Sequence, residues 1–370
     1  MLVILNSTNA CNLGCRYCSA KTNGSVRRDL SEDDCQLLVA QLPAILKEDE
    51  PVTWLWHGGE PTLLSPEQFD AMQTILSTLA DHLQRTLMQS NAYAVTKDWI
   101  NVLLKHDVSV GVSLDGPKET HDAARPAING SGTYDLARAN ALALRDAGMA
   151  VSLLCTLDKT HIGREEMILD WLIEMDMPIR FNPLSRFGRS SESLSGAEYY
   201  RFLIDLFKGV LKKRYSGSIQ PLEWMSRSVI FDEEATECAY NGQCGKTFFS
   251  IGPGAEITPC GRLKKSFGNL RDSTLDELWQ SSGWSSLRER SDRLATGECR
   301  SCEIWNFCKG GCPADEDNRL EKAECDAKRE FFDWLRTDGL ELYRKALIER
   351  KKEIRAALEL LRAEKDRMLI

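Results

Sequence analysis

The chain has 370 residues, which is more than one compact core usually contains, so two domains or one large barrel with an appended part are expected. Its 55 acidic and 47 basic side chains give a net charge of -8, and no block of Lys or Arg resembles a phosphate-binding stripe, which argues against nucleic acid as a partner. The sequence contains neither an export signal nor a run of about 18 apolar residues, so we expect a cytoplasmic protein without a membrane partner.

Short runs rich in β-branched residues alternate with longer amphipathic stretches over residues 1–215. This alternation predicts βα units and a parallel sheet with right-handed crossovers. Because six units are fewer than the eight of a closed barrel, we expect an α/β fold with a partial (β/α)6 TIM-like barrel, whose site lies at the carboxyl ends of the strands. The predicted strands are Leu2–Asn6, Val52–His57, Thr86–Asn91, Val108–Leu114, Met149–Thr156 and Pro178–Leu184.

Helical patterns follow the strands, and several begin with a Ser or Thr cap. They include Ser31–Leu46, Pro66–Leu83, Thr133–Ala147 and Ser195–Lys213.

From about residue 216 the pattern changes to short strands, turns and cysteines. A turn is predicted at residues 252–254, between the strands Phe248–Ile251 and Glu256–Thr258. We therefore expect a separate, cluster-held domain at residues 216–335.

Residues 336–370 predict an amphipathic C-terminal helix to which we assign no function. A coiled-coil partner is one possibility, but charged residues between the apolar positions favour a single helix that lies on its own protein. The apolar residues recur every seven positions, at Leu340, Leu347, Ile354, Leu361 and Met368.

Thirteen cysteines in a chain without an export signal favour metal binding over disulfides. Three of them lie close to the N-terminus and eight lie between Cys238 and Cys325. The other two, Cys35 and Cys155, are expected to be small buried hydrophobic residues.

Cys11, Cys15 and Cys18 lie in a loop directly after the first predicted strand. Three thiolates leave one iron of a cubane cluster without a protein ligand, whereas a zinc site normally takes a fourth Cys or His. Zinc or inert thiols are the alternative. The CxxxCxxC spacing, with Tyr17 before the last cysteine, resembles the radical S-adenosylmethionine (SAM) superfamily, in which SAM chelates the open iron.

Two further segments are similar to SAM-binding motifs of that superfamily. The resemblance implies that Gly58, Gly59 and Glu60, after the second strand, hold the SAM amino group. It also implies that Ser113 and Asp115, at the end of the fourth strand, contact the ribose, and that Tyr17 packs on the adenine. The run from His121 to Tyr134 resembles the peptide-acting members.

Eight cysteines in the C-terminal part resemble the SPASM domain of sulfatase-maturing and peptide-modifying radical SAM enzymes, and they suffice for two closed [4Fe–4S] clusters. Together with the SAM cluster this implies three [4Fe–4S] clusters. Two structural zinc sites are the alternative. Ala255 stands where the family usually has glycine. The resemblance assigns Cys238, Cys244, Cys260 and Cys312 to an inner cluster, and Cys299, Cys302, Cys308 and Cys325 to an outer one.

The resemblance implies a 5′-deoxyadenosyl radical and a net two-electron oxidation. In sulfatase-maturing enzymes an aspartate acts as base after the cysteine equivalent to Cys260, whereas this chain has Gly261 and Arg262. Residues 89–92 read Gln-Ser-Asn-Ala in place of Gln-Thr-Asn-Gly. These departures favour a maturase that forms a carbon–carbon, carbon–oxygen or thioether cross-link in a ribosomal precursor peptide. The alternatives are a formylglycine-forming sulfatase maturase or other side-chain oxidase, and a non-catalytic iron–sulfur or zinc-held scaffold.

The expected partners are a precursor peptide and an electron donor such as flavodoxin or ferredoxin. A winged-helix module that grips a leader peptide does not fit before Cys11, so leader binding is expected from the C-terminal helix, from Ser216–Glu237 or from a separate protein. No acid–base residue stands out.

Overall fold

The computed structural model describes residues 1–18, 26–79, 82, 84–184, 193–235, 237–263, 265–315 and 322–368. Six parallel strands, each followed by helix, form a partial barrel whose strands pair in sequence order. The predicted (β/α)6 arrangement is confirmed. The strands are β1 (Leu2–Asn6), β2 (Val52–His57), β3 (Gln84–Ser90), β4 (Ser109–Ser113), β5 (Val151–Leu157) and β6 (Ile179–Pro183).

Within the described residues the sheet continues beyond the barrel at both edges and has ten strands. β7 (Ile219–Gln220) pairs with β6, and β8 (Phe248–Gly252) pairs in parallel with β1. β8 forms the predicted hairpin with β9 (Glu256–Thr258), and β10 (Gly268–Asn269) completes that edge. The cysteine-rich part is therefore joined to the barrel through a continuous sheet, and the division of the chain into domains stays a prediction.

Three helices of the barrel begin at serine caps, whereas Thr133, which precedes the helix Tyr134–Asp146, makes no side-chain capping hydrogen bond. Ser31, Ser65 and Ser195 each accept a hydrogen bond from the backbone three residues on, which satisfies a free helix N–H. Pro43 ends the first helix early, in a 3-10 turn at Leu42–Ala44. The second helix ends at Leu76, and part of its predicted remainder lies outside the described residues. The barrel helices are α1 (Glu32–Gln41), α2 (Pro66–Leu76), α3 (Lys97–Lys105), α4 (Lys118–Ala124), α5 (Tyr134–Asp146), α6 (Glu165–Met175) and α7 (Gly196–Lys213).

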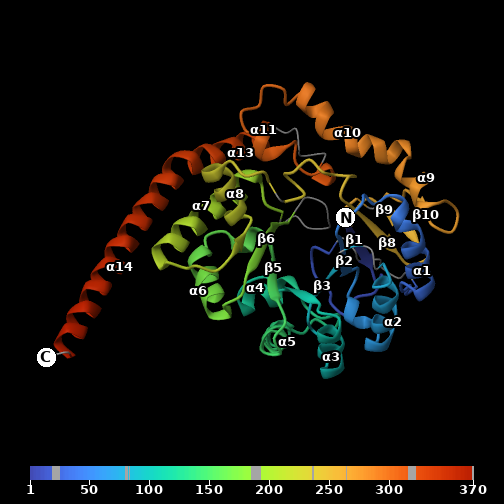
Figure 1. Cartoon of the computed structure of the whole chain (residues 1–370), viewed down its shortest axis with the longest axis horizontal. Helices are drawn as coiled ribbons and strands as arrows, with labels where there is room; N and C mark the ends of the chain where they lie inside the picture. Colours follow the sequence, from blue (N-terminus) through green and yellow to red (C-terminus); the bar gives the residue numbers. More distant parts are fainter. Residues whose placement is uncertain are drawn as a thin grey trace.

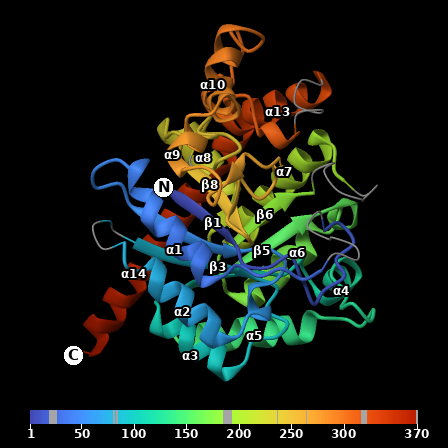
Figure 2. The same cartoon turned by 90° about the vertical axis from the view of Figure 1, so that its right-hand side faces the viewer.

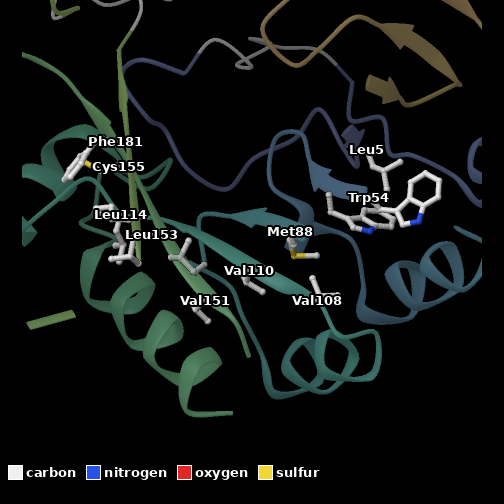
Figure 3. Packing of buried hydrophobic residues seen from close by; sticks show 14 of the residues in the cluster. Leu5, Trp54, Met88, Val108, Val110, Leu114, Val151, Leu153, Cys155 and Phe181 are labelled. Atoms are coloured by element: carbon white, nitrogen blue, oxygen red, sulfur yellow. The ribbon is translucent and has the colours of Figure 1, made fainter. Parts of the chain in front are cut away.

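The core lies between the sheet and these helices. Alternate residues of β2 and β5 are buried, as expected for strands with one face against helices. Figure 3 shows Leu5, Trp54, Met88, Val110 and Leu153 along successive strands of this core. Cys35 and Cys155 are buried in the same cluster, as predicted.

The remaining helices carry the cysteine-rich part, which lies at the opposite end of the molecule from α3 and α5 in Figures 1 and 2. They are α8 (Leu222–Phe231), α9 (Leu275–Trp279), α10 (Ser282–Thr296), α11 (Trp305–Cys308) and α13 (Lys322–Trp334).

A π-helical turn at Leu335–Gly339 joins α13 to α14 (Leu340–Met368). Figure 1 shows α14 leaving the body of the protein and carrying the C-terminus away from it. Leu347 is 39% exposed and Ile348 is 53% exposed. Glu353 nevertheless pairs with Arg214 at the end of α7, so α14 contacts its own protein at least as far as that residue. The side chains of Ile354, Leu361 and Met368 lie outside the described residues, so the expectation for that part of the helix stays a prediction.

Candidate functional site

The glycine-rich turn after β2 packs directly on the chain that leads from β1 to the first cysteine. Gly59 N donates to Thr8 O at 2.7 Å, and Glu60 N donates to Ala10 O at 2.9 Å. A Cβ atom at position 59 would lie 1.9 Å from the Ala10 carbonyl oxygen, and Gly58 has a φ of +122°. Glycine is therefore needed at both positions for the close approach of the two backbones.

Glu60 is 1% exposed and ties the ends of β2 and β3 together. Its Oε1 accepts from Thr62 N, Thr62 Oγ1 and Ser90 Oγ, and its Oε2 accepts from Asn91 N at 2.8 Å. Burial raises the pKa of Glu60, although these hydrogen bonds oppose the rise. A carboxylate oxygen has two lone pairs, so Oε2 keeps capacity for an amino group. The predicted contact with the SAM amino group stays a prediction.

Asp115 is fully buried and joins the cysteine loop to β4 and β5. Its Oδ2 accepts from Tyr17 Oη at 2.5 Å and from Arg125 Nε at 2.8 Å, and its Oδ1 accepts from Thr156 N at 2.8 Å. Burial alone would raise the pKa of Asp115, but the Arg125 guanidinium holds it below its usual range. The carboxylate thus positions Tyr17, whose ring lies 5.4 Å from the guanidinium carbon. The predicted ribose contact stays a prediction.

Ser113 lies at the end of β4 and is 7% exposed. Its Oγ accepts from Gln89 Nε2 at 2.9 Å. A side chain at Gly111 would lie 2.4 Å from Gln89 Oε1, so this glycine leaves room for the glutamine. Ser113 therefore holds the first residue of the Gln-Ser-Asn-Ala segment, and its contact with ribose stays a prediction.

The segment after β4 holds the cysteine loop from the other side. Gly14 N donates to Pro126 O at 2.7 Å, and Arg16 N donates to Ala124 O at 3.0 Å. The loop is therefore fixed by backbone hydrogen bonds on both flanks, independently of any bound group.

His121 supports this segment from the core. Its Nδ1 accepts from Asp115 N at 3.2 Å, and its Nε2 lies 3.0 Å from the Thr133 hydroxyl, which in turn donates to Arg125 O. Burial lowers the pKa of His121 to about 4. The imidazole is thus neutral at physiological pH and works as a structural link.

The structure brings the three N-terminal cysteines together in the predicted loop. Burial raises the pKa of the Cys11 thiol to about 11, and the nearby Cys15 and Cys18 thiols raise this pKa as well. Cys11 Sγ accepts from Leu13 N at 3.5 Å and lies 3.8 Å from Asn91 Nδ2. Burial raises the pKa values of Cys11 and Cys15, and amide donors lie beside Cys11, which fits a cluster whose thiolates need charge stabilisation. The roles of the three cysteines as ligands stay predictions.

The C-terminal cysteines fall into two groups. Cys238, Cys260 and Cys312 all act electrostatically on Cys244 and raise its pKa, which burial takes to about 12. This is the set assigned above to the inner cluster. Leu263 N donates to Cys260 Sγ at 3.2 Å.

The second group lines a cavity of about 440 Å³. Cys299, Cys302, Cys308 and Cys325 contribute to its wall, and the last three act electrostatically on Cys299. The structure thus places together the set assigned to the outer cluster. Lys328, which the sequence analysis missed, donates to Cys308 Sγ at 3.4 Å. Its spacing of three residues from Cys325 on a helix was the available signal.

The spacing within these groups bears on the zinc alternative. A tetrahedral zinc site needs sulfur atoms within about 4 Å of one another. Among the described residues no three His, Cys, Asp or Glu side chains are placed to hold a single metal ion.

Comparisons with known proteins identify the families that the chain resembles. Residues 5–172 match the family model described as the radical SAM superfamily, and residues 238–303 match the iron–sulfur cluster-binding domain SPASM. The cysteine-type anaerobic sulfatase-maturating enzyme of Clostridium perfringens is 25% identical over 360 residues, which cover 90% of this chain and 95% of the relative. The serine-type enzyme of Klebsiella aerogenes is 24% identical, over 87% of this chain and 82% of the relative.

Two solved structures share the fold. The native anSMEcpe with bound AdoMet and Cp18Cys peptide has a TM-score of 0.79 at 22% identity and covers 93% of this chain and 98% of that one. Streptococcus suis SuiB bound to the precursor peptide SuiA has a TM-score of 0.65 at 18% identity, with 87% and 73% covered. In the part of the chain that the structure describes, no helix is long and apolar enough to cross a membrane.

Proposed function

Since the chain is a radical SAM enzyme that carries a SPASM domain, we propose that it oxidises a side chain of a peptide or protein substrate by two electrons. The observation that carries this proposal is the pairing of one three-cysteine loop at the mouth of an open barrel with two four-cysteine groups beside it. SAM and the iron–sulfur clusters supply, when bound, the carbon-centred radical chemistry and the electron acceptor.

In this scheme the chain's own residues bind the clusters and orient SAM and the substrate. Cys11, Cys15 and Cys18 supply three thiolates, which would leave one iron of a bound cubane cluster without a protein ligand. The turns at Gly59 and Asp115 flank the cysteine loop. Two fully cysteine-ligated sites have no open position, so they are suited to accept an electron rather than to bind substrate. The proposed functional units are residues 1–215, 216–335 and 336–370.

Formylglycine formation is one candidate product, and the anaerobic sulfatase-maturating relatives favour it. Cross-linking of a precursor peptide is the other. It is favoured by Gly261 and Arg262, which follow Cys260 where the sulfatase-maturing family has its aspartate base. The proposed partners are the peptide, a reducing protein such as flavodoxin or ferredoxin, and a leader-binding element or protein.

The test uses the anaerobically reconstituted protein with SAM, dithionite and one of two peptides: the Cp18Cys peptide or a short peptide encoded beside this chain's gene. We expect 5′-deoxyadenosine and a product of one of two kinds. An aldehyde that reacts with a hydrazide probe identifies formylglycine. A mass lower by two hydrogens without an aldehyde identifies a cross-link. Bound zinc, or no 5′-deoxyadenosine while the N-terminal cluster is demonstrably reduced, would overturn the proposal.

A further inference from the structure

Helix α13 contributes both a cation, Lys328, and a thiol, Cys325, to the outer cysteine group. Cys325 and Lys328 are three residues apart and therefore share a face of the helix. Lys328 Nζ lies 3.4 Å from Cys308 Sγ, on the far wall of the cavity that both cysteines line. The same ammonium lies 5.5 Å from the centre of the Tyr240 ring. The Lys328 ammonium thus lies close to both the Cys308 thiol and the Tyr240 ring.

The charge of Lys328 is directed at sulfur rather than at a carboxylate. Among the residues that the structure describes, Lys328 forms no ion pair with Asp or Glu. Its neighbour Arg329 also reaches the group, at Cys302, but its side chain is 37% exposed and it pairs with Asp326 at 2.6 Å. Solvent and the carboxylate screen Arg329, so Lys328 exerts the stronger field on the thiolates.

The inner group also has cations near it. Arg262 acts electrostatically on Cys238, and Arg290 acts on Cys244. The Arg290 guanidinium donates to the backbone carbonyls of Gly310 and Gly311. A charged donor forms a stronger bond to an anionic acceptor than a neutral one does, so the bond from Lys328 to Cys308 bears directly on the outer site.

We propose that Lys328 is a positioning residue that holds Cys308 and raises the reduction potential of the outer cluster. The proposal rests on the outer ligand set given under the proposed function. A cluster gains one negative charge when it takes up one electron, and a nearby cation with an N–H···S bond stabilises the more negative form. Cluster potentials depend on net charge, hydrogen bonds to sulfur and solvent exposure, and Lys328 affects all three.

A raised potential would make the outer site a better acceptor of one electron. Cys299, Cys302, Cys308 and Cys325 would hold the cluster that supplies this capacity when it is bound.

The experiment is a redox titration followed by electron paramagnetic resonance. It uses the full-length chain with Cys11, Cys15 and Cys18 all changed to Ala, so that only the auxiliary clusters contribute signals. The outer signal is identified by its absence in Cys325→Ala. At a fixed potential, Lys328→Met is expected to lower the ratio of reduced to oxidised outer cluster about tenfold, which corresponds to a shift of 59 mV to lower potential for one electron. The inner signal should not move.

Three matched variants accompany this measurement. Lys328→Arg, which keeps the charge and the N–H donors, is expected to restore most of the shift. Arg329→Met should shift the outer potential by less than Lys328→Met does. Lys322→Met removes an exposed cation from the same helix at the rim of the cavity and should leave the potential unchanged.

Each adverse result has a distinct meaning. An unchanged outer potential in Lys328→Met, or an equal shift in Lys322→Met, would overturn the role of Lys328. Loss of the outer cluster from both Lys328 variants would also overturn it, because the residue would then serve cluster assembly. If instead Cys325→Ala removes no signal and no iron, the ligand set itself is wrong. The titration needs no substrate, so none of these outcomes depends on the peptide proposal.

Discussion

The N-terminal cysteine site is anchored by the barrel, whereas the C-terminal cysteines lie on short helices and turns. Backbone hydrogen bonds join Gly59 to Thr8 and Gly14 to Pro126, so distant strands fix the N-terminal loop. Around the outer cysteines the backbone bonds are local: Cys302 N donates to Cys299 O, and α11 has a single turn. The N-terminal site is therefore preformed by the fold, whereas the order of the C-terminal sites depends on what their cysteines bind.

The largest effect we predict separates chemistry from folding at the N-terminal site. Cys15→Ala should abolish 5′-deoxyadenosine formation, because a cluster with two protein thiolates cannot present the single open iron that SAM needs. The circular dichroism spectrum and the thermal midpoint should stay close to wild type, since the barrel holds the loop. A loss of barrel structure in this variant would show that the fold alone does not hold the N-terminal loop. Cys35→Ala, a buried cysteine outside all three groups, serves as the control for thiol removal.

The next effect concerns the whole C-terminal part. Removal of iron under anaerobic conditions should expose residues 237–315 to limited proteolysis, while the barrel stays protected, because cluster binding energy contributes to folding where backbone bonds are local. Mass spectrometry of the first cleavage sites measures this. First cuts within α2 or α5 of the iron-free protein would show that the barrel, too, depends on bound iron.

The buried charge pair of the barrel provides a stability test. Asp115→Asn leaves the Arg125 guanidinium, which is 7% exposed, without its carboxylate. Breaking such a pair should reduce the free energy of unfolding by about 3–5 kcal/mol. Asp70→Asn is the matched control: its carboxylate is 34% exposed and its partner Lys105 is 57% exposed, and the loss there should be at most about 1 kcal/mol. Urea unfolding measures both, and equal losses would show that Asp115 does not anchor the loop.

Local sequence signals predicted much of this barrel and failed where contacts span long distances. The alternation of apolar residues predicts the bounds of β1 and β2 correctly, because a half-buried strand has a period of two. The pairing of β8 with β1 brings together residues about 245 positions apart, such as Leu2 and Phe248, and no local pattern encodes it. The interleaving of the cysteine groups came from family resemblance, since spacing alone is compatible with many ligand sets.

The candidate site shows the same division. Gly58, Gly59 and Glu60 are visible as a motif, but the partners that fix Glu60 are Ser90 and Asn91, supplied by the next strand. Lys328 is inconspicuous in a sequence with many lysines. Its importance depends on the fold of α13 against α11, which only the three-dimensional structure reveals.

The smallest effect we predict is local to the glycine-rich turn. Gly59→Ala places a Cβ atom 1.9 Å from the Ala10 carbonyl oxygen, so the backbone that leads to Cys11 must move. Overpacking of this kind should cost about 1–3 kcal/mol of stability and weaken SAM binding, which equilibrium dialysis of the reconstituted protein measures. Gly283→Ala lies in α10, where the nearest atom would be 3.5 Å away, and should change neither quantity. Undiminished SAM binding in Gly59→Ala would mean that the loop tolerates displacement, and its description as a rigid, fold-determined site would then fail.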